Sequence, residues 1–315
     1  PSILSVFLGH FLDKTMNCIE KSSSIDADFR SKILSNFKKI PNFLRENTDR
    51  NRTSPFAFTG NKFEFRAVGS SQNCATPMTV LNIVVADSID KMLELIKKYQ
   101  KTEKSFEVAV LRSIKDVLAR TRDIRFEKDG YSKEWQREAK KRGLYTNNRL
   151  LTALGELVVD KNINLFAKYD ILTEVELRSR FSAWSNLYNT NKMIEINVLL
   201  EMLENSVIPD IIAYRTFIIN SLKDTKGVLE AALVRGERNL LKEYAELISK
   251  LFTKKDELVA YKKIFKNKEE LSGINYVYEN INPIIADIKD ILDKLEKRTG
   301  EKYWSLLKYK DLLFF

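Results

Sequence analysis

Apolar residues recur every three or four positions along most of this 315-residue chain, which is the spacing of amphipathic α-helices. One such row lies between residues 76 and 99 and consists of Met78, Leu81, Val85, Ile89, Met92 and Ile96. Thr76 and Pro77 mark its start, because threonine caps a first turn well and proline fits the first helical position. We therefore expect a helix that runs to about Tyr99, with its apolar row buried against a neighbouring strand.

The same helical spacing continues from Ser105 almost to the end of the chain. The longest predicted helix runs from Glu174 to about Glu204, another follows Pro209, and the last strong one runs from Asn282 to about Lys297. Glycine and proline, the residues that break helices, number only 10 and 6. These patterns predict an α+β fold that is predominantly α-helical.

A period of two replaces the helical spacing in one short stretch. Between Lys62 and Arg66 polar and apolar residues alternate, as in a half-buried strand. Lys62, Glu64 and Arg66 then lie on one face, and Phe63 and Phe65 lie on the other, toward the helix that follows. The strand therefore presents one carboxylate between two cations.

Two further segments are predicted to extend this strand into a small sheet. Ile3 to Leu8 has the β-branched and aromatic content of a buried strand, although it is short enough to be the start of a helix. Asn51 to Pro55 lies close enough to Lys62–Arg66 to return as an antiparallel neighbour. Between these segments we expect one helix from Gly9 to about Glu20 and another from Ala27 to Phe37.

The charged face of the strand suits phosphoryl transfer. Glu64 can supply a hard oxygen ligand to Mg²⁺ or Mn²⁺, and Arg52, Lys62 and Arg66 can neutralise phosphate or carboxylate oxygens. The alternative is a cross-strand ion pair on a solvated sheet face, a common arrangement in proteins. The spacing alone allows both interpretations.

Charge and cysteine content exclude several other functions. The net charge is +10, but basic and acidic residues are interleaved, whereas a nucleic-acid binder concentrates basic residues on one face. Cys18 and Cys74 have no partner at a metal-binding spacing, which is typical of a reducing cytoplasm. His10 is the only histidine, so no His-based catalytic set or metal cluster is available, and the longest apolar run, Val80 to Ala86, is too short to cross a membrane.

The stretch NRTSPFAFTGNKFEFR, from Asn51 to Arg66, resembles the signature of glutamine synthetases in the form found in the large type III class. The segment PSILSVFLG from Pro1 resembles the type III segment that follows the flexible active-site loop. GYSKEWQREAKKRGL from Gly130 and YWSLLKYKDLLFF from Tyr303 resemble its downstream helix and its C-terminal end. The resemblance covers essentially all of this chain but only the C-terminal part of the family's polypeptide.

The resemblance also implies a division of the chain. Residues 1–100 would be the end of the catalytic domain, including a remnant of its antiparallel sheet, a class-specific insertion at residues 10–48 and a core helix. Residues 101–315 would form a helical C-terminal region. The family further implies a cytoplasmic homo-oligomer arranged as a ring.

The family joins ammonia to glutamate through a γ-glutamyl phosphate made from ATP. By position, the resemblance implies that Glu64 is a metal carboxylate, that Arg66 and Arg52 hold substrate or phosphoryl oxygens, and that Lys62 contacts ATP. Ala57 departs from the pattern, because the shorter classes place a second ATP-binding arginine there. Most metal ligands would lie upstream of Pro1, so the isolated chain is expected to be inactive. The competing interpretation is a non-catalytic helical interaction or scaffold protein.

Overall fold

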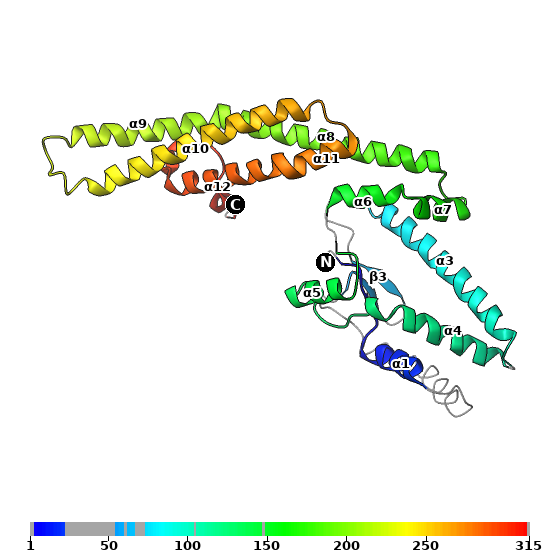
Figure 1. Cartoon of the computed structure of the whole chain (residues 1–315). Helices are drawn as coiled ribbons and strands as arrows, with labels where there is room; N and C mark the ends of the chain where they lie inside the picture. The colour runs from blue at the N-terminus through cyan, green and yellow to red at the C-terminus, as the bar shows by residue number, and fades with distance from the viewer. Residues whose placement is uncertain are drawn as a thin grey trace. The chain divides into compact units, whose positions relative to one another are not determined.

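The computed structural model describes residues 3–22, 54–59, 62–66, 73–103, 105–146 and 149–313. It comprises two compact units, Pro1–Glu174 and Val175–Phe315 (Figure 1). Helices predominate and a small sheet lies in the first unit, so the predicted helix-rich α+β class is confirmed at that level. The predicted division at residue 100 falls between α3 (Ala75–Gln100) and α4 (Phe106–Arg120), which pack together, and it stays a prediction about a longer polypeptide.

A mixed sheet of three short strands lies in the first unit. The strands are β1 (Val6–Phe7), β2 (Phe56–Phe58) and β3 (Phe63–Phe65), in that spatial order. β2 and β3 are antiparallel, but β1 and β2 are parallel, so the expectation of a purely antiparallel sheet is wrong here. The reason is the long connection between β1 and β2, which allows the chain to cross over and pair in the parallel sense.

Helices α1 and α5 flank the sheet strands in sequence and match their predictions. α1 (His10–Lys21) confirms the helix expected after Gly9, while the helix expected at residues 27–37 lies outside the described residues. α5 (Lys133–Lys141) starts where the Ser132 hydroxyl accepts a hydrogen bond from the Trp135 N–H at 3.1 Å. The part of this unit that the structure describes also contains a 3₁₀ turn (Arg122–Ile124), α6 (Leu150–Leu157) and α7 (Asp160–Lys168).

Helix α3 begins one residue before the predicted cap. Cys74, rather than Thr76, is the N-cap residue, and its side chain makes no capping hydrogen bond. The side-chain oxygen of Asn73, one residue earlier, accepts a hydrogen bond from the Ala75 N–H at 2.8 Å. Pro77 is the third helical residue, where its missing N–H is still without cost because the first turn has no intrahelical acceptors. Among the described residues of α3, only Ile83 is classed as buried.

The apolar row of α3 is therefore not a buried core in this chain. Val85 is 48% exposed and Ile89 is 55% exposed, so the predicted burial of this row against the strand is wrong for Val85. Leu81 and Met92 are only half-buried. The helix packs instead on α4 and α7, and Tyr99 donates a hydrogen bond to Asp116 of α4 at 2.5 Å.

A cluster of charged side chains links α3 to the C-terminal end of α7 through ion pairs and hydrogen bonds. Asp87 forms ion pairs with Lys91 at 2.5 Å and with Lys168 at 2.9 Å, and the Tyr169 hydroxyl donates to Asp90 at 2.7 Å. The Lys91 hydrogen bond, followed by that from Lys168, lowers the pKa of Asp87 from 3.8 to about 2. A depressed carboxyl pKa stabilises the folded state above pH 3.8, and this contribution is lost as the pH falls through 2.

Removing either lysine should therefore raise the pKa of Asp87 toward its ordinary value. Lys91→Met and Lys168→Met should each raise it, because the hydrogen bonds from these two lysines are the two largest causes of the shift. The measurement is a carbon-detected NMR titration of the Asp87 carboxyl in both variants. An unchanged midpoint in both would show that the ion pairs do not persist in solution.

The second unit is a bundle of long helices lying side by side (Figure 1). Its α-helices are α8 (Glu174–Met202), α9 (Ile208–Asp224), α10 (Arg235–Phe265), α11 (Glu270–Tyr276) and α12 (Asn282–Arg298). Two π-helical turns, Leu203–Val207 and Val277–Ile281, join α8 to α9 and α11 to α12. Short 3₁₀ turns follow at Glu301–Tyr303 and Tyr309–Leu312.

Proline explains both π-helical turns. Pro209 and Pro283 lack the N–H that would bond the carbonyl four residues earlier, and their rings crowd that carbonyl. In each case that carbonyl, of Asn205 or Glu279, lies within the π-helical turn, where the wider spacing relieves the conflict. The helical conformation therefore continues from α8 into α9 and from α11 into α12, past a proline that normally ends a helix.

The second unit has one continuous hydrophobic core, which includes a buried hydrogen bond between two polar side chains. Isoleucines and leucines of α8, α10 and α12 form one cluster, which includes the fully buried Leu251, Leu258 and Ile288. Tyr244 shares a hydrogen bond with Thr299 at 2.6 Å, and its burial raises its pKa to about 12. In the part of the chain that the structure describes, no helix is both long and apolar enough to cross a membrane.

Candidate functional site

The hairpin of β2 and β3 is built by its aromatic residues. Phe56 pairs with Phe65, and Phe58 pairs with Phe63, so all four phenylalanines lie on one face. The Phe56 and Phe63 rings stack with centroids 4.7 Å apart, and the Thr59 N–H closes the turn on the Lys62 carbonyl at 2.9 Å. The predicted strand and its alternation are confirmed, and its antiparallel neighbour is Phe56–Phe58. Of the predicted neighbour, Pro55 also accepts a hydrogen bond from the Arg66 N–H at 2.7 Å, while residues 51–53 lie outside the described residues.

The opposite face of β3 carries the predicted charges. Arg66 donates to one oxygen of Glu64 through Nη2 at 3.1 Å and Nε at 3.3 Å, and the Lys62 ammonium lies 3.4 Å from the other oxygen. The Arg66 hydrogen bond, followed by that from Lys62, lowers the pKa of Glu64 below 4.5. The carboxylate is thus ionised at neutral pH and, at 40% exposure, open to solvent.

These residues fit a metal site only as one part of it. Mg²⁺ prefers six oxygen ligands in octahedral geometry, and one carboxylate supplies one or two of them. Among the described residues, no group of three or more His, Cys, Asp or Glu side chains could hold a metal ion. Glu64 would therefore contribute to such a site only together with ligands from elsewhere.

Two other positions that the sequence singled out are Arg52 and Ala57. Arg52 lies outside the described residues, so its predicted role stays a prediction. Ala57 is fully buried opposite Glu64 and beside Phe7 of β1. A long cationic side chain has no space at this position, which gives a physical reason for the departure from the shorter classes.

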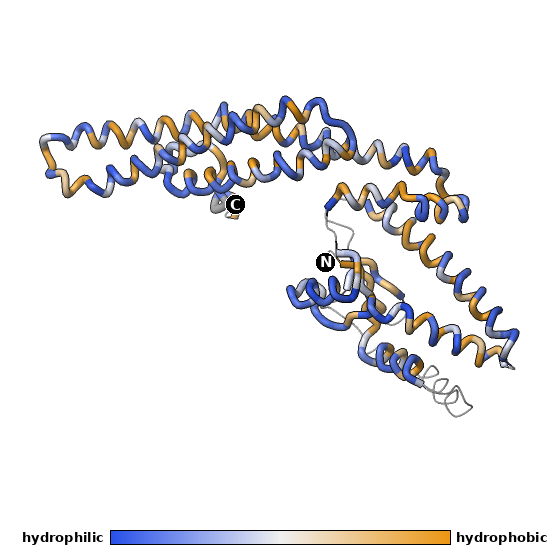
Figure 2. The backbone as a smooth tube through the Cα atoms, in the orientation of Figure 1, coloured by the Kyte–Doolittle hydropathy of each residue, from blue (hydrophilic) through white to orange (hydrophobic). Residues whose placement is uncertain are grey.

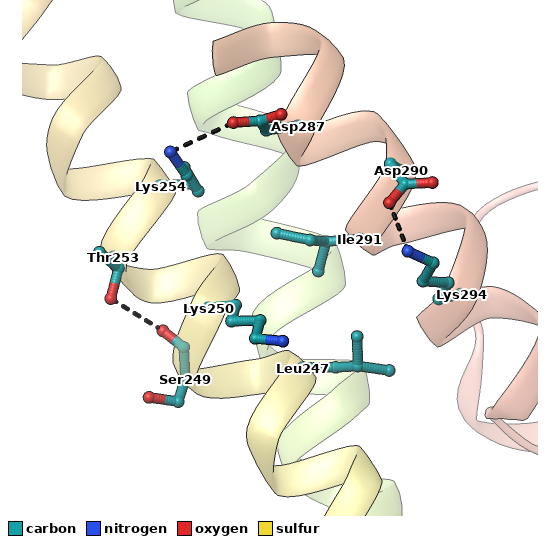
Figure 3. Close-up of a pocket in the computed structure, with 9 residues that line it drawn as sticks. All are labelled: Leu247, Ser249, Lys250, Thr253, Lys254, Asp287, Asp290, Ile291 and Lys294. Carbon is teal, nitrogen blue, oxygen red and sulfur yellow. Dashed lines mark hydrogen bonds and ion pairs between the residues drawn. The ribbon is translucent and has the colours of Figure 1, made fainter. Parts of the chain in front are cut away.

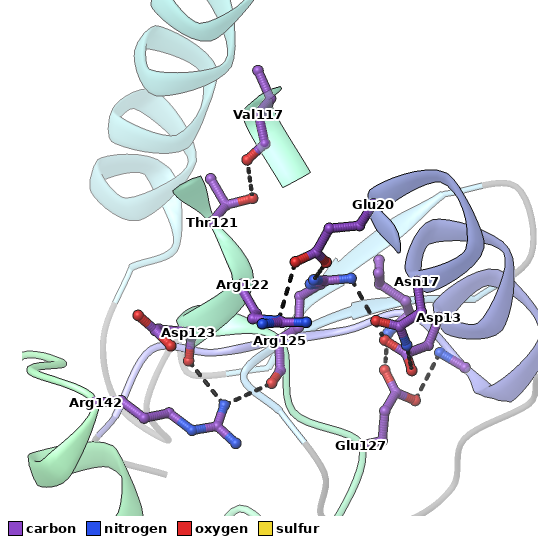
Figure 4. Close-up of polar contacts among 12 residues, drawn as sticks. Asp13, Asn17, Glu20, Val117, Thr121, Arg122, Asp123, Arg125, Glu127 and Arg142 are labelled. Carbon is purple, nitrogen blue, oxygen red and sulfur yellow. Dashed lines mark hydrogen bonds and ion pairs between the residues drawn. The ribbon is translucent and has the colours of Figure 1, made fainter. Parts of the chain in front are cut away.

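Sequence reasoning missed a polar network at the other edge of the sheet (Figure 4). The chain that follows α4 pairs with β1, since the Phe126 N–H donates to the Val6 carbonyl at 3.0 Å. Glu127 accepts hydrogen bonds from the N–H groups of Leu8 and Gly9 at 2.8 and 3.0 Å. This carboxylate therefore fixes the point at which β1 leads into α1.

Arg125 connects the same edge to helix α1. Its guanidinium forms an ion pair with Glu20 at 2.5 Å and lies 3.9 Å from Asp13 (Figure 4). The Arg125 side chain is only 8% exposed, and its Nε has no hydrogen-bond partner among the residues that the structure describes. Removing one member of a buried ion pair leaves an uncompensated buried charge, which destabilises the fold. The Arg125–Glu20 pair therefore stabilises the packing of α1 against the sheet. Partners about a hundred positions apart leave no local sequence signal.

A groove of about 320 Å³ lies between α10 and α12 in the second unit (Figure 3). Four of its five charged side chains already neutralise one another, because Lys254 pairs with Asp287 at 3.2 Å and Lys294 pairs with Asp290 at 2.5 Å. A charged ligand would meet only the fifth, Lys250, unless it displaced these pairs. The strand face around Glu64 is therefore the better candidate for chemistry.

Comparisons with known proteins bear on this strand. The protein-family model described as glutamine synthetase C-terminal domain matches residues 109–226. A glutamine synthetase of Bacteroides fragilis is 32% identical, with the match covering 100% of this chain and 44% of the relative. The type-3 glutamine synthetase of Dictyostelium discoideum is 34% identical, with coverage of 100% and 43%. The chain thus spans less than half the length of these relatives and matches their C-terminal part.

Proposed function

Since the chain belongs to the glutamine synthetases and corresponds to the C-terminal part of a type III polypeptide, we propose that it contributes β3 to a site that joins ammonia to glutamate. The observation that supports this most directly is the ionised Glu64, held between Lys62 and Arg66 on an open strand face. This face belongs to the same stretch of sequence that resembles the family signature.

The proposed roles follow from the charge that each step develops. ATP phosphorylates the side-chain carboxylate of glutamate, and ammonia then displaces phosphate, so negative charge grows on phosphoryl oxygens in both steps. Arg66 can hold a carboxylate or phosphoryl group through its planar fork, and Lys62 can neutralise an ATP phosphate as a point charge. Arg52 would bind phosphoryl or substrate oxygens from the preceding segment.

Glu64 would act as one carboxylate ligand of the Mg²⁺ or Mn²⁺ on the ATP side. A divalent cation bound there supplies neutralisation of the phosphoryl oxygens. Glu64 must first leave its pairs with Arg66 and Lys62, and that exchange is feasible because all three side chains are solvent-accessible. The remaining ligands, the ring-shaped homo-oligomer and a cytoplasmic location belong to the same proposal for the complete enzyme.

A non-catalytic helical interaction protein is the competing function. Its specific support is that Glu64 already has partners on both oxygens, as in a structural ion pair. The two functions differ in what happens when the polypeptide is complete, since only the enzyme gains activity.

The isolated 315-residue chain is expected to form no glutamine from glutamate, ammonia and MgATP, because one carboxylate does not make a metal site. The complete open reading frame that contains this chain should form glutamine under the same conditions. Glutamine formation by the isolated chain would contradict the proposed dependence on further ligands. A folded product of the complete reading frame without activity would refute the proposed function and favour the interaction protein.

A further inference from the structure

Helix α3 leaves much of its first half uncovered, although most of its side chains there are apolar. Met78, Val85 and Ile89 form one row along the helix and are 45%, 48% and 55% exposed. Val80 and Val84 form a second row, about 100° or more around the helix from Val85, and are 37% and 44% exposed. Orange, the colour of hydrophobic residues, recurs along this part of α3 in Figure 2.

The same half of α3 carries no charge on any side. No Asp, Glu, Lys or Arg occurs from Ala75 to Ala86, although 30% of the whole chain is charged. Its polar side chains, Thr76, Thr79 and Asn82, are all uncharged. So few polar groups are more characteristic of a helix in a protein core than of a surface helix, which has a polar face. Ile83 is the one described residue of α3 that reaches full burial, and it lies one helical turn before Asp87, which pairs with Lys168 of α7.

The sheet of the same unit is also incomplete by ordinary standards. Its strands contain two or three residues each, whereas strands of about five or six residues are typical. Its aromatic face is partly open, because Phe63 is 46% exposed. The short strands and the exposed aromatic face are both typical of a unit that packs against further polypeptide.

The length of the relatives identifies that polypeptide. Each match covers 100% of this chain but only 43% or 44% of the relative, at its C-terminal end. We propose that the first half of α3 is a docking surface for the part of a glutamine synthetase that precedes this matched region. The inference rests on the proposed function, and it assigns to α3 the task of joining the two parts of the catalytic domain.

The chemistry of the occupant follows from the surface. The two rows offer no charged group, and their one exposed amide is Asn82, which lies in the first row between Met78 and Val85. The docked segment must therefore present a largely apolar, uncharged face with a hydrogen-bonding group opposite Asn82, such as one face of a sheet. A charged segment would lose hydration without gaining a partner. Association is therefore expected to depend little on salt concentration.

Thiol accessibility tests this surface directly. Val85→Cys is introduced after Cys18 and Cys74 have both been replaced by serine, in the 315-residue chain and in the complete open reading frame that contains it. The introduced thiol should react rapidly with a maleimide in the 315-residue chain and at least about ten-fold more slowly in the complete product, because docking buries it. Equal rates in the two proteins, or a reading frame that adds no preceding polypeptide, would overturn the proposal.

A charge placed on the surface provides the second test, with Val175→Glu on α8 as the matched control. Val85 and Val175 are both exposed valines on helices, at 48% and 77% exposure. In the 315-residue chain each change to glutamate should shift the melting temperature by less than about 2 °C. In the complete product, Val84→Cys is combined with either Val85→Glu or Val175→Glu. The thiol at position 84 should react fast with maleimide only in the protein that carries Val85→Glu, because only that glutamate disrupts docking.

Two further outcomes separate this proposal from its alternatives. If modification of the Val85→Cys thiol slows in the 315-residue chain as its concentration rises and dimers form, the surface joins two copies and the proposal is wrong. Because the rate of thiol modification requires no catalysis, the docking surface can be confirmed where glutamine formation is absent. It can equally be refuted where glutamine formation is present.

Discussion

Glu64→Gln, introduced into the complete open reading frame, should lower the rate of glutamine formation on the order of 100-fold or more while the protein remains folded. Glutamine keeps the shape and volume of the side chain but removes the charge that binds a hard cation. The Mg²⁺ concentration required for half-maximal activity should rise in parallel with the loss of turnover. Steady-state kinetics over a range of Mg²⁺ concentrations measure both effects.

Arg66→Lys should separate substrate binding from metal binding. Arg66 reaches Glu64 through both Nε and Nη2, which is the planar fork that also recognises carboxylate and phosphoryl groups. Lysine preserves the positive charge and loses the fork, so the KM for glutamate should rise while the Mg²⁺ dependence changes little. A glutamate titration at saturating Mg²⁺ and ATP measures this difference.

Glu138→Gln on α5 is the matched control for Glu64→Gln. Glu138 is 49% exposed and pairs with Arg142, much as Glu64 is 40% exposed and pairs with Arg66. An exposed ion pair contributes roughly 1 kcal/mol or less to stability, so Glu138→Gln should leave activity close to wild type. If Glu64→Gln behaves like this control, the strand carries a structural ion pair and Glu64 is not a metal ligand.

The sequence predicted the local features of this site because they depend on neighbours in the chain. Alternation over five residues determines which side chains share a face of β3, and the structure confirms that arrangement. The network of Arg125 with Glu20 and Glu127 with Gly9 was not predictable in this way. Its members lie about a hundred residues apart, and only tertiary folding brings them together.

The apolar row of α3 shows a different limit of sequence reasoning. The pattern correctly predicts a helix suited to a core, but it does not specify which polypeptide covers the helix. Val85 is half-exposed in this chain because α4 and α7 cover other parts of α3. Hydrophobic periodicity thus predicts that one face of a helix is suited to burial, but it does not predict which part of a protein buries that face.

Gly273→Ala should destabilise the second unit by about 1–3 kcal/mol, because α8 and α11 approach too closely there for a side chain. A Cβ atom at Gly273 would lie 2.5 Å from Nδ2 of Asn189, closer than atoms in van der Waals contact. Asn189 is only 9% exposed, and its Nδ2 donates to the Glu270 carbonyl at 3.0 Å. The alanine must displace this buried amide and break its hydrogen bond.

Gly236→Ala on α10 supplies a control with the opposite sign. A Cβ atom there meets nothing within 4 Å, and alanine favours helix over glycine, so this variant should be more stable by about 0.5–1 kcal/mol. Urea unfolding gives both changes, and hydrogen exchange of the α8 and α11 amides shows whether the loss for Gly273→Ala is local to the contact. Replacing Asn189 with alanine as well should remove the clash, so the double variant should lose less stability than the sum of the two single changes. Strict additivity of the two changes would show that Asn189 does not lie against Gly273 in solution.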